Sequence, residues 1–157
     1  MKKADIIFLK RQGIDQVTNH TLPVEHAYKV VKLRRAINDA YDAILKDEDA
    51  CREAAEIKDG HAFDKELFEL RNNAARTDEQ EKRLNDMEAQ LQRFIDLKEE
   101  MKKQDIAIEG TKTMPYDMWH KLQCENADKD LGGRKSDLLA GPVEDLLEGL
   151  LWEAPKD

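Results

Sequence analysis

Apolar side chains recur every seven residues along the middle of the chain, from Phe63 to Met101. A seven-residue repeat with two apolar rows is typical of a long helix that packs lengthwise on another helix. The pattern therefore predicts a helix over residues 64–103. The main row comprises Phe63, Leu70, Thr77, Leu84, Leu91 and Lys98, and Met87, Phe94 and Met101 accompany it.

An earlier repeat predicts another long helix, over residues 23–58. Pro23 suits the first helical position, because its missing N–H would have no partner there. Gly60 can adopt the left-handed conformation that ends many helices, so we expect the helix to end near residues 58–60. The apolar rows comprise Val30, Ile37, Ile44 and Cys51, together with Leu33, Ala40 and Ala54.

The second helix is either continuous or broken between Asn72 and Thr77. Asn72 and Asn73 are weak helix formers, and Thr77 with Gln80 fits a capping box, in which each side chain satisfies a backbone N–H of the other residue. Both alternatives remain open. Because the apolar row keeps its phase, both pieces of a broken helix would face the same partner. A short turn joins the two predicted helices, so we expect them to fold back on each other as an antiparallel hairpin.

Two short apolar runs, at residues 6–9 and 106–108, predict brief strands. A helical hairpin would bring both to the same end, where they could pair. The predicted fold is therefore mainly α, with a long antiparallel helical hairpin, a minor two-stranded β element and short C-terminal helices. We expect a single elongated domain: residues 1–22 as N-terminal strand and loop, 23–104 as the hairpin, and 105–157 as the second strand and C-terminal helices.

The C-terminal region contains both tryptophans and two prolines that mark helix starts. Pro115 begins a helix that carries Trp119, and Pro142 begins another over residues 143–152. Core packing is the first interpretation of both tryptophans. The last helix is nevertheless more apolar than a peripheral helix requires, so we predict that it binds a protein. The residues of this predicted interaction surface are Leu146, Leu147, Leu150, Leu151 and Trp152.

The chain has a net charge of -8, with 38% charged and 6% aromatic residues. This acidic balance argues against broad binding to nucleic acid, which requires a local excess of Lys and Arg. The densest basic group, Lys29, Lys32, Arg34 and Arg35, is flanked by acidic residues and is interpreted as a solvated helix face. We therefore expect a protein partner or self-association.

The sequence predicts neither secretion nor membrane insertion. The N-terminal apolar run is too short for the core of a signal peptide, and no segment approaches the roughly 20 apolar residues of a membrane span. Cys51 and Cys124 are far apart and follow no metal or redox spacing, which is typical of a reduced intracellular protein. The expected location is the cytoplasm, or a particle assembled in it.

No catalytic motif of recognised spacing is present. Asp117, His120 and Cys124 would share one helix face, but a metal site usually needs a fourth ligand, so we expect no metal there. We likewise expect no cofactor and no enzymatic activity, and a metal-dependent enzyme that uses these three residues is a third hypothesis. The segment around Arg134 and Lys135 resembles a phosphate-binding loop only in its glycines and basic residues. It supports an alternative function, an oligomeric module that binds a small ligand or nucleotide through Arg134 and Lys135.

The order of elements resembles a group of small phage-encoded helical proteins of unknown function. The matching positions are Leu22, Pro23, Ala27 and Tyr28, then Lys32 and Leu33, and later Met114, Pro115 and Tyr116. This resemblance implies a phage or prophage origin and carries over no catalytic residue. The resulting hypothesis is a non-catalytic protein that acts by helix-mediated association in the host cytoplasm or the phage particle. It would be a virion or assembly accessory component, or an inhibitor of a host factor.

Overall fold

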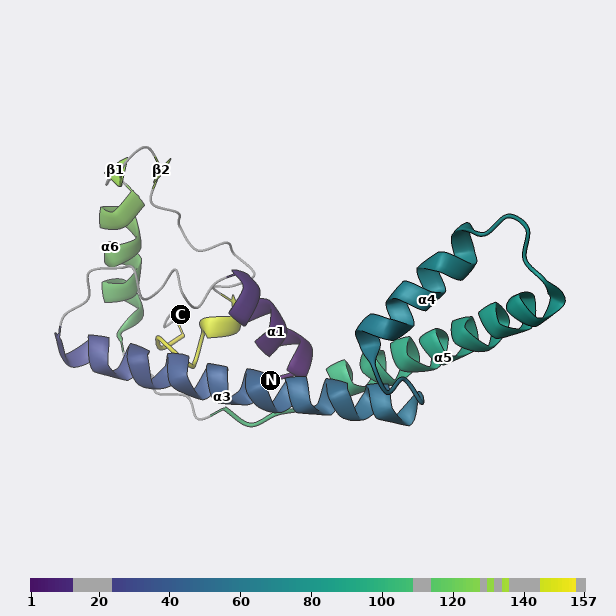
Figure 1. Cartoon of the computed structure of the whole chain (residues 1–157). Coiled ribbons are helices and arrows are strands. Elements are labelled where there is room, and N and C mark those ends of the chain that lie inside the picture. Colours follow the sequence, from purple (N-terminus) through teal and green to yellow (C-terminus); the bar gives the residue numbers. More distant parts are fainter. Residues whose placement is uncertain (13–23, 109–113, 128–129, 132–133, 136–144, 155–157) are drawn as a thin grey trace. The chain divides into compact units, whose positions relative to one another are not determined.

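Helices account for most of the described chain. The computed structural model describes residues 1–12, 24–108, 114–127, 130–131, 134–135 and 145–154. No helix in this part of the chain is both long and apolar enough to cross a membrane. The prediction of a mainly α fold is confirmed. The elements are α1 (Lys3–Gln12), α3 (Val24–Ala54), α4 (Gly60–Asn72), α5 (Asp78–Lys103) and α6 (Tyr116–Ala127), with the two-residue strands β1 (Asp130–Leu131) and β2 (Arg134–Lys135) (Figure 1).

The chain divides into two compact units. The first unit comprises Met1–Asp42 and Asp105–Asp157, and the second unit comprises Ala43–Gln104. Helix α3 begins in the first unit and ends in the second. The description of the whole chain as one elongated domain stays a prediction.

The N-terminal apolar run forms part of α1, so the predicted strand at residues 6–9 is wrong. Ile6 and Leu9 lie three positions apart on one helix face and are fully buried, whereas Phe8 is exposed. At the helix start, the Asp5 carboxylate accepts a hydrogen bond of 2.7 Å from the backbone N–H of Lys2. An acidic residue at the third helical position satisfies the N-terminal backbone in this way, which favours a helix.

A single antiparallel bridge stands where the sequence predicts two paired strands. It joins Lys2 to Asp105, and the backbone N–H of Ile106 donates to the carbonyl oxygen of Met1 over 2.8 Å. The two segments therefore meet, but residues 106–108 form no strand. Strands β1 and β2 pair with each other elsewhere in the chain, so the predicted β element is not confirmed.

Helix α3 buries five residues of the apolar rows that the sequence predicts, whereas Cys51 is half-buried and Ala54 is exposed. The helix begins at Val24, next to Pro23, which lies outside the described residues. It ends at Ala54, earlier than the predicted end near residues 58–60. The buried members of its rows are Val30, Leu33, Ile37, Ala40 and Ile44.

The left-handed residue that follows the end of α3 is Glu56, whereas the sequence predicts Gly60 for this position. Glu56 adopts a left-handed φ of 63°. Its N–H donates to the carbonyl oxygen of Glu53 over 2.9 Å, and the N–H of Ile57 donates to that of Arg52 over 3.0 Å. These two bonds define a Schellman motif, in which the left-handed residue is usually glycine. The prediction for Gly60 is therefore wrong, and Gly60 is instead the first residue of α4.

The second predicted helix is broken into α4 and α5. The N–H of Gln80 donates to Thr77 Oγ1 over 3.3 Å, and the N–H of Thr77 donates to Gln80 Oε1 over 3.1 Å, which confirms the capping box. On the α4 side, the Arg76 guanidinium donates to the carbonyl oxygens of Leu70 and Asn73 over 3.0 and 2.9 Å. These side chains satisfy backbone groups that a continuous helix would have paired internally.

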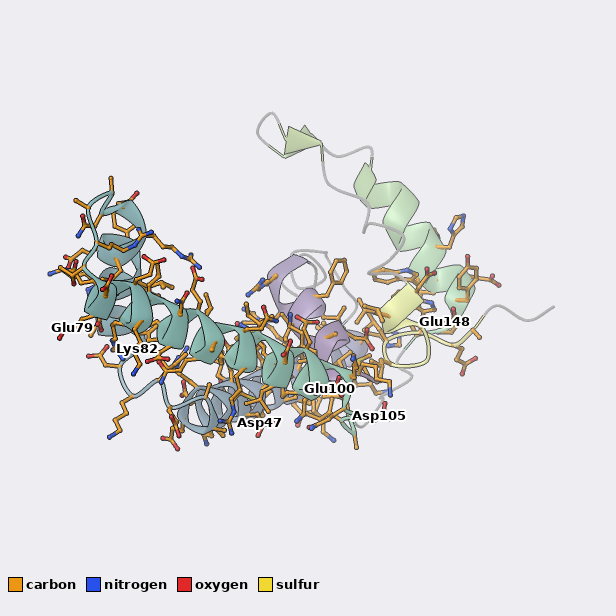
Figure 2. All side chains as sticks on the ribbon, turned by 90° about the vertical axis from the view of Figure 1, so that its right-hand side faces the viewer. Asp47, Glu79, Lys82, Glu100, Asp105 and Glu148 are labelled. Carbon is orange, nitrogen blue, oxygen red and sulfur yellow. The ribbon has the colours of Figure 1, made fainter. Side chains whose placement is uncertain are left out.

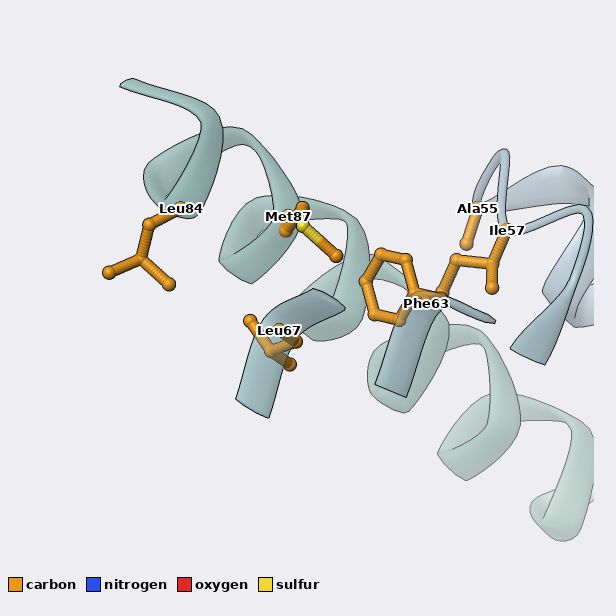
Figure 3. Close-up of a cluster of buried hydrophobic side chains, with 6 residues drawn as sticks. All are labelled: Ala55, Ile57, Phe63, Leu67, Leu84 and Met87. Atoms are coloured by element: carbon orange, nitrogen blue, oxygen red, sulfur yellow. The ribbon is translucent and has the colours of Figure 1, made fainter. Parts of the chain in front are cut away.

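The two halves of the heptad stripe pack against each other. Helix α5 turns back alongside α4 (Figure 1), and apolar side chains from both helices and from the turn after α3 meet in one cluster (Figure 3). Because the stripe is folded on itself, the predicted antiparallel hairpin between the helices over residues 23–58 and 64–103 is not confirmed. The buried members of the cluster are Ala55, Ile57, Phe63, Leu67, Leu84 and Met87, and Leu70, Leu91 and Phe94 pack against it.

Charged side chains cover the outer side of α5, among them Glu79, Lys82 and Glu100 (Figure 2). Two charged pairs join α5 to α4. In the first, Arg71 Nε donates to Glu88 Oε1 over 3.2 Å. In the second, Arg83 Nε and Nη2 donate to the two carboxylate oxygens of Glu66 over 2.7 and 2.9 Å. These hydrogen bonds from Arg83 lower the pKa of Glu66, because they favour its ionised form.

Replacing Glu56 by glycine tests the helix end. Glu56→Gly should raise the free energy of unfolding by about 1 kcal/mol, because glycine adopts the left-handed conformation without the steric cost of a Cβ. Urea denaturation followed by circular dichroism measures the change. Glu53→Gly is the matched control in the last turn of α3, and it should destabilise the protein by a similar amount. A destabilised Glu56→Gly variant would contradict the left-handed assignment.

Replacing Arg83 by alanine tests the link between α4 and α5. At neutral pH the free energy of unfolding should fall by about 0.5 kcal/mol, since the pair is half exposed. The pKa of Glu66 is lower in the folded chain than in the unfolded chain. The pair therefore contributes its full stabilisation at a pH above the pKa of Glu66 in the unfolded chain, and the stabilisation is lost as the pH falls through the pKa in the folded chain. The difference between the unsubstituted chain and Arg83→Ala should therefore shrink between about pH 5 and pH 3. Urea titrations across this pH range measure the difference, with Arg93→Ala as control. A difference in the free energy of unfolding that does not depend on pH would contradict the ion pair of Arg83 with Glu66.

Candidate interaction site

Three of the five residues predicted to bind a partner lie in the core of the first unit. Leu147, Leu151 and Trp152 are at most 1% exposed. Trp152 stacks on Trp119, with ring centroids 4.6 Å apart and ring planes 7° apart, so the core interpretation of both tryptophans is confirmed. Buried side chains stabilise the unit itself. Leu146 and Leu150, both half-buried, are the accessible members of the predicted surface.

The described end of the chain is not the continuous helix that the sequence predicts. Helical conformation covers residues 145–147, and Gly149 then adopts a left-handed φ of 76°. The N–H of Met114 donates to the carbonyl oxygen of Leu151 over 3.2 Å, and the N–H of Glu153 donates to that of Met114 over 3.1 Å. The predicted last helix is therefore wrong in this part, because the glycine turn and the pairing with Met114 redirect the backbone.

A pocket of about 480 Å³ in the first unit is lined by Leu146 and Leu150. Ile106 and Ile108 line the same pocket. The apolar run that the sequence predicts as a strand thus supplies part of an aliphatic wall. Four branched aliphatic side chains around one opening provide a surface that favours an apolar occupant.

Carboxylates are the charged side chains that line this pocket, and Met1, which carries the α-amino group, lines it as well. Asp5, Asp145 and Glu148 all line it, and Asp145 and Glu148 are exposed; Figure 2 labels Glu148. Asp105 directly precedes Ile106 in the sequence. Its carboxylate accepts a hydrogen bond of 2.8 Å from the Lys2 ammonium, which lowers the pKa of Asp105. The pocket therefore combines an aliphatic wall with three acidic groups. An apolar occupant that carries cations is complementary to both features.

The alternative ligand-binding residues are found in the short strand pair. Arg134 and Lys135 form β2, which pairs with β1 in the register Leu131↔Arg134 and Asp130↔Lys135. The side chains of Arg134 and Lys135 lie outside the described residues, so ligand binding through them stays a prediction.

The possible metal ligands of the sequence lie on α6. Asp117 and His120 are exposed, and the His120 ring stacks on that of Tyr116 with centroids 6.1 Å apart. The side chain of Cys124 lies outside the described residues. Among the residues that are described, no group of three or more His, Cys, Asp or Glu side chains could hold a metal ion.

A second pocket, of about 430 Å³, lies in the second unit near Arg52 and Phe94. The Arg52 guanidinium carbon and Lys98 Nζ each lie 5.6 Å from the centroid of the Phe94 ring. Both cations are also paired with acids of the same unit, Arg52 with Asp49 at 2.7 Å and Lys98 with Glu48 at 2.6 Å. These contacts compensate the positive charge, so the arrangement serves packing rather than ligand recognition.

No protein-family model, curated protein or solved structure matches this chain. No sequence pattern predicts the pocket of the first unit, because its lining comes from three separate segments of the chain. The sequence feature that points to this pocket is the excess of apolar residues at 106–108 and among the C-terminal leucines. Only the tertiary structure shows that these two segments line the same pocket.

Replacing Gly149 by alanine tests the turn that shapes the pocket. A Cβ at this position would meet no atom within 4 Å, so the expected loss of stability, about 1 kcal/mol, comes from the left-handed backbone alone. Tryptophan fluorescence during urea unfolding measures it, because the turn precedes the stacked Trp152. Glu148→Ala is the neighbouring control and should leave stability nearly unchanged. Equal stability of Gly149→Ala and the unsubstituted chain would refute the turn.

Proposed function

We propose that this protein is non-catalytic and acts by helix-mediated protein-protein association, with the pocket of the first unit as the receiving surface. The observation that carries the proposal is the combination of four aliphatic side chains with three carboxylates around one pocket. A helix that binds in a groove inserts its apolar face, and the charges beside that face select its orientation. The partner is therefore an amphipathic helix with Lys or Arg beside its apolar face.

The size of the pocket supports a short contact. A volume of about 480 Å³ accommodates a few side chains, so about two turns of a partner helix suffice to fill it. The half-buried Leu146 and Leu150 are available for this contact without disturbing the stacked tryptophans.

We further propose a phage or prophage setting, on the basis of the resemblance at the positions around Leu22 to Tyr28 and Met114 to Tyr116. Met114 is 1% exposed, and its backbone pairs with the segment that follows the pocket leucines. In this setting the protein is a virion or assembly accessory component, or an inhibitor of a host factor, in the host cytoplasm or the particle.

A synthetic amphipathic helix of leucine and lysine, labelled with a fluorophore, tests the receiving surface. We expect it to bind the unsubstituted chain and to bind Asp145→Lys/Glu148→Lys at least about fivefold more weakly, because charge attraction at the pocket becomes repulsion. Fluorescence anisotropy measures both affinities. Glu69→Lys/Glu153→Lys carries the same change in net charge at exposed positions that do not line the pocket, and it should bind almost like the unsubstituted chain.

A helix with the same leucines but glutamate in place of lysine separates specific binding from apolar adhesion. It should bind far more weakly than the lysine helix. The proposal fails if the two helices bind equally well, if the pocket and control variants lose affinity to the same extent, or if neither helix binds.

A further inference from the structure

The first turns of α3 present an apolar row to solvent. Val24, Tyr28 and Val31 are 88%, 76% and 52% exposed. They lie at i, i+4 and i+7 and therefore share one helix face. The other side of the same turns is buried through Val30 and Leu33. A tyrosine exposed between two valines offers a large amphipathic side chain of the kind enriched in protein interfaces.

Basic side chains border this row. Lys29, Lys32 and Arg35 are exposed, whereas Arg34 of the same basic group is half-buried. Helical spacing places Lys32 and Arg35 beside the row and Lys29 further around the helix. The exposed Asp39 follows Arg35 one turn later. Among the described residues, none of these three exposed cations forms an ion pair with an acidic side chain. The apolar row, Lys32 and Arg35 are called the α3 face below. It is a locally basic and apolar surface on a chain whose net charge is -8.

The α3 face and the acidic pocket belong to the same unit and are complementary. The face offers apolar side chains bordered by cations, and the pocket offers an aliphatic wall bordered by carboxylates. The stretch from Val24 to Val31 spans roughly 10 Å along the helix axis, which matches the two-turn contact that the pocket suits. Because the face is exposed in the single chain, it does not fill the pocket of its own copy.

We propose that the α3 face of one copy binds the acidic pocket of a second copy. The inference rests on the proposed function, since it uses the same pocket, and it names the occupant. Two different surfaces meet in this contact, so two copies can make it twice in a closed twofold dimer, each face in the pocket of the other copy. A head-to-tail arrangement makes the contact once per pair, leaves one face and one pocket unoccupied, and builds a ring or a filament by repetition.

Reversal of charge on either surface tests the contact. Lys32→Glu/Arg35→Glu makes the α3 face acidic, and Asp145→Lys/Glu148→Lys makes the pocket basic. Each variant alone brings like charges together, so it should stay monomeric in sedimentation velocity at concentrations at which the unsubstituted chain assembles. An equimolar mixture should assemble again, because each altered surface then meets a surface of opposite charge. High salt should weaken the assembly of the unsubstituted chain.

Two further variants serve as control and as a test of the apolar part. Lys46→Glu/Lys58→Glu makes the same charge change at exposed positions outside the α3 face, and it should assemble like the unsubstituted chain. Tyr28→Ser leaves every charge in place and should weaken self-association about tenfold through loss of the aromatic contact. Circular dichroism of each variant verifies that it remains folded.

The outcomes separate this inference from the proposed function. A monomeric unsubstituted chain, reversed variants that assemble normally, or a mixture that stays monomeric each overturn the inference. If the chain is monomeric while its pocket still binds the leucine–lysine helix, the pocket serves another protein and the proposed function stands. If the chain neither assembles nor binds that helix, both proposals fail.

Discussion

The way in which each helix satisfies its terminal backbone groups decides which apolar faces meet in this protein. The capping box of Thr77 and Gln80 and the Arg76 guanidinium stabilise an interruption within a stripe that would otherwise continue. Once the chain is interrupted there, α5 folds back on α4 and the stripe packs on itself (Figure 3). A few polar contacts at helix ends thereby select one of two folds that hydrophobic periodicity alone permits.

The first unit depends on a comparable backbone device. Gly149 in the left-handed region and the pairing of Met114 with the C-terminal segment hold Trp152 against Trp119. This arrangement directs Leu147 and Leu151 inward and leaves Leu146 and Leu150 at the pocket. The stacked rings and the accessible leucines are consequences of one turn, so the stability of the unit and the shape of its candidate binding surface are physically linked.

Charge in this protein is distributed according to its packing. In the second unit, charged side chains pair across neighbouring helices, as Lys98 does with Glu48 and Arg83 with Glu66. In the first unit, cations line an exposed apolar row and carboxylates line an aliphatic pocket. Such separation contributes to orientation and specificity more than to affinity. A net charge of -8 averages over these surfaces and conceals both.

The sequence by itself determined the mainly helical fold, the buried rows of α3 and the cap at Thr77, because helical periodicity and capping are local properties. It misplaced the end of α3, because a glutamate stands where glycine is usual, and it assigned residues 6–9 to a strand. Only the tertiary structure decided how the heptad stripe is folded and that Ile106, Leu146 and Glu148 line one pocket. Convergence of distant segments depends on contacts that no local pattern encodes.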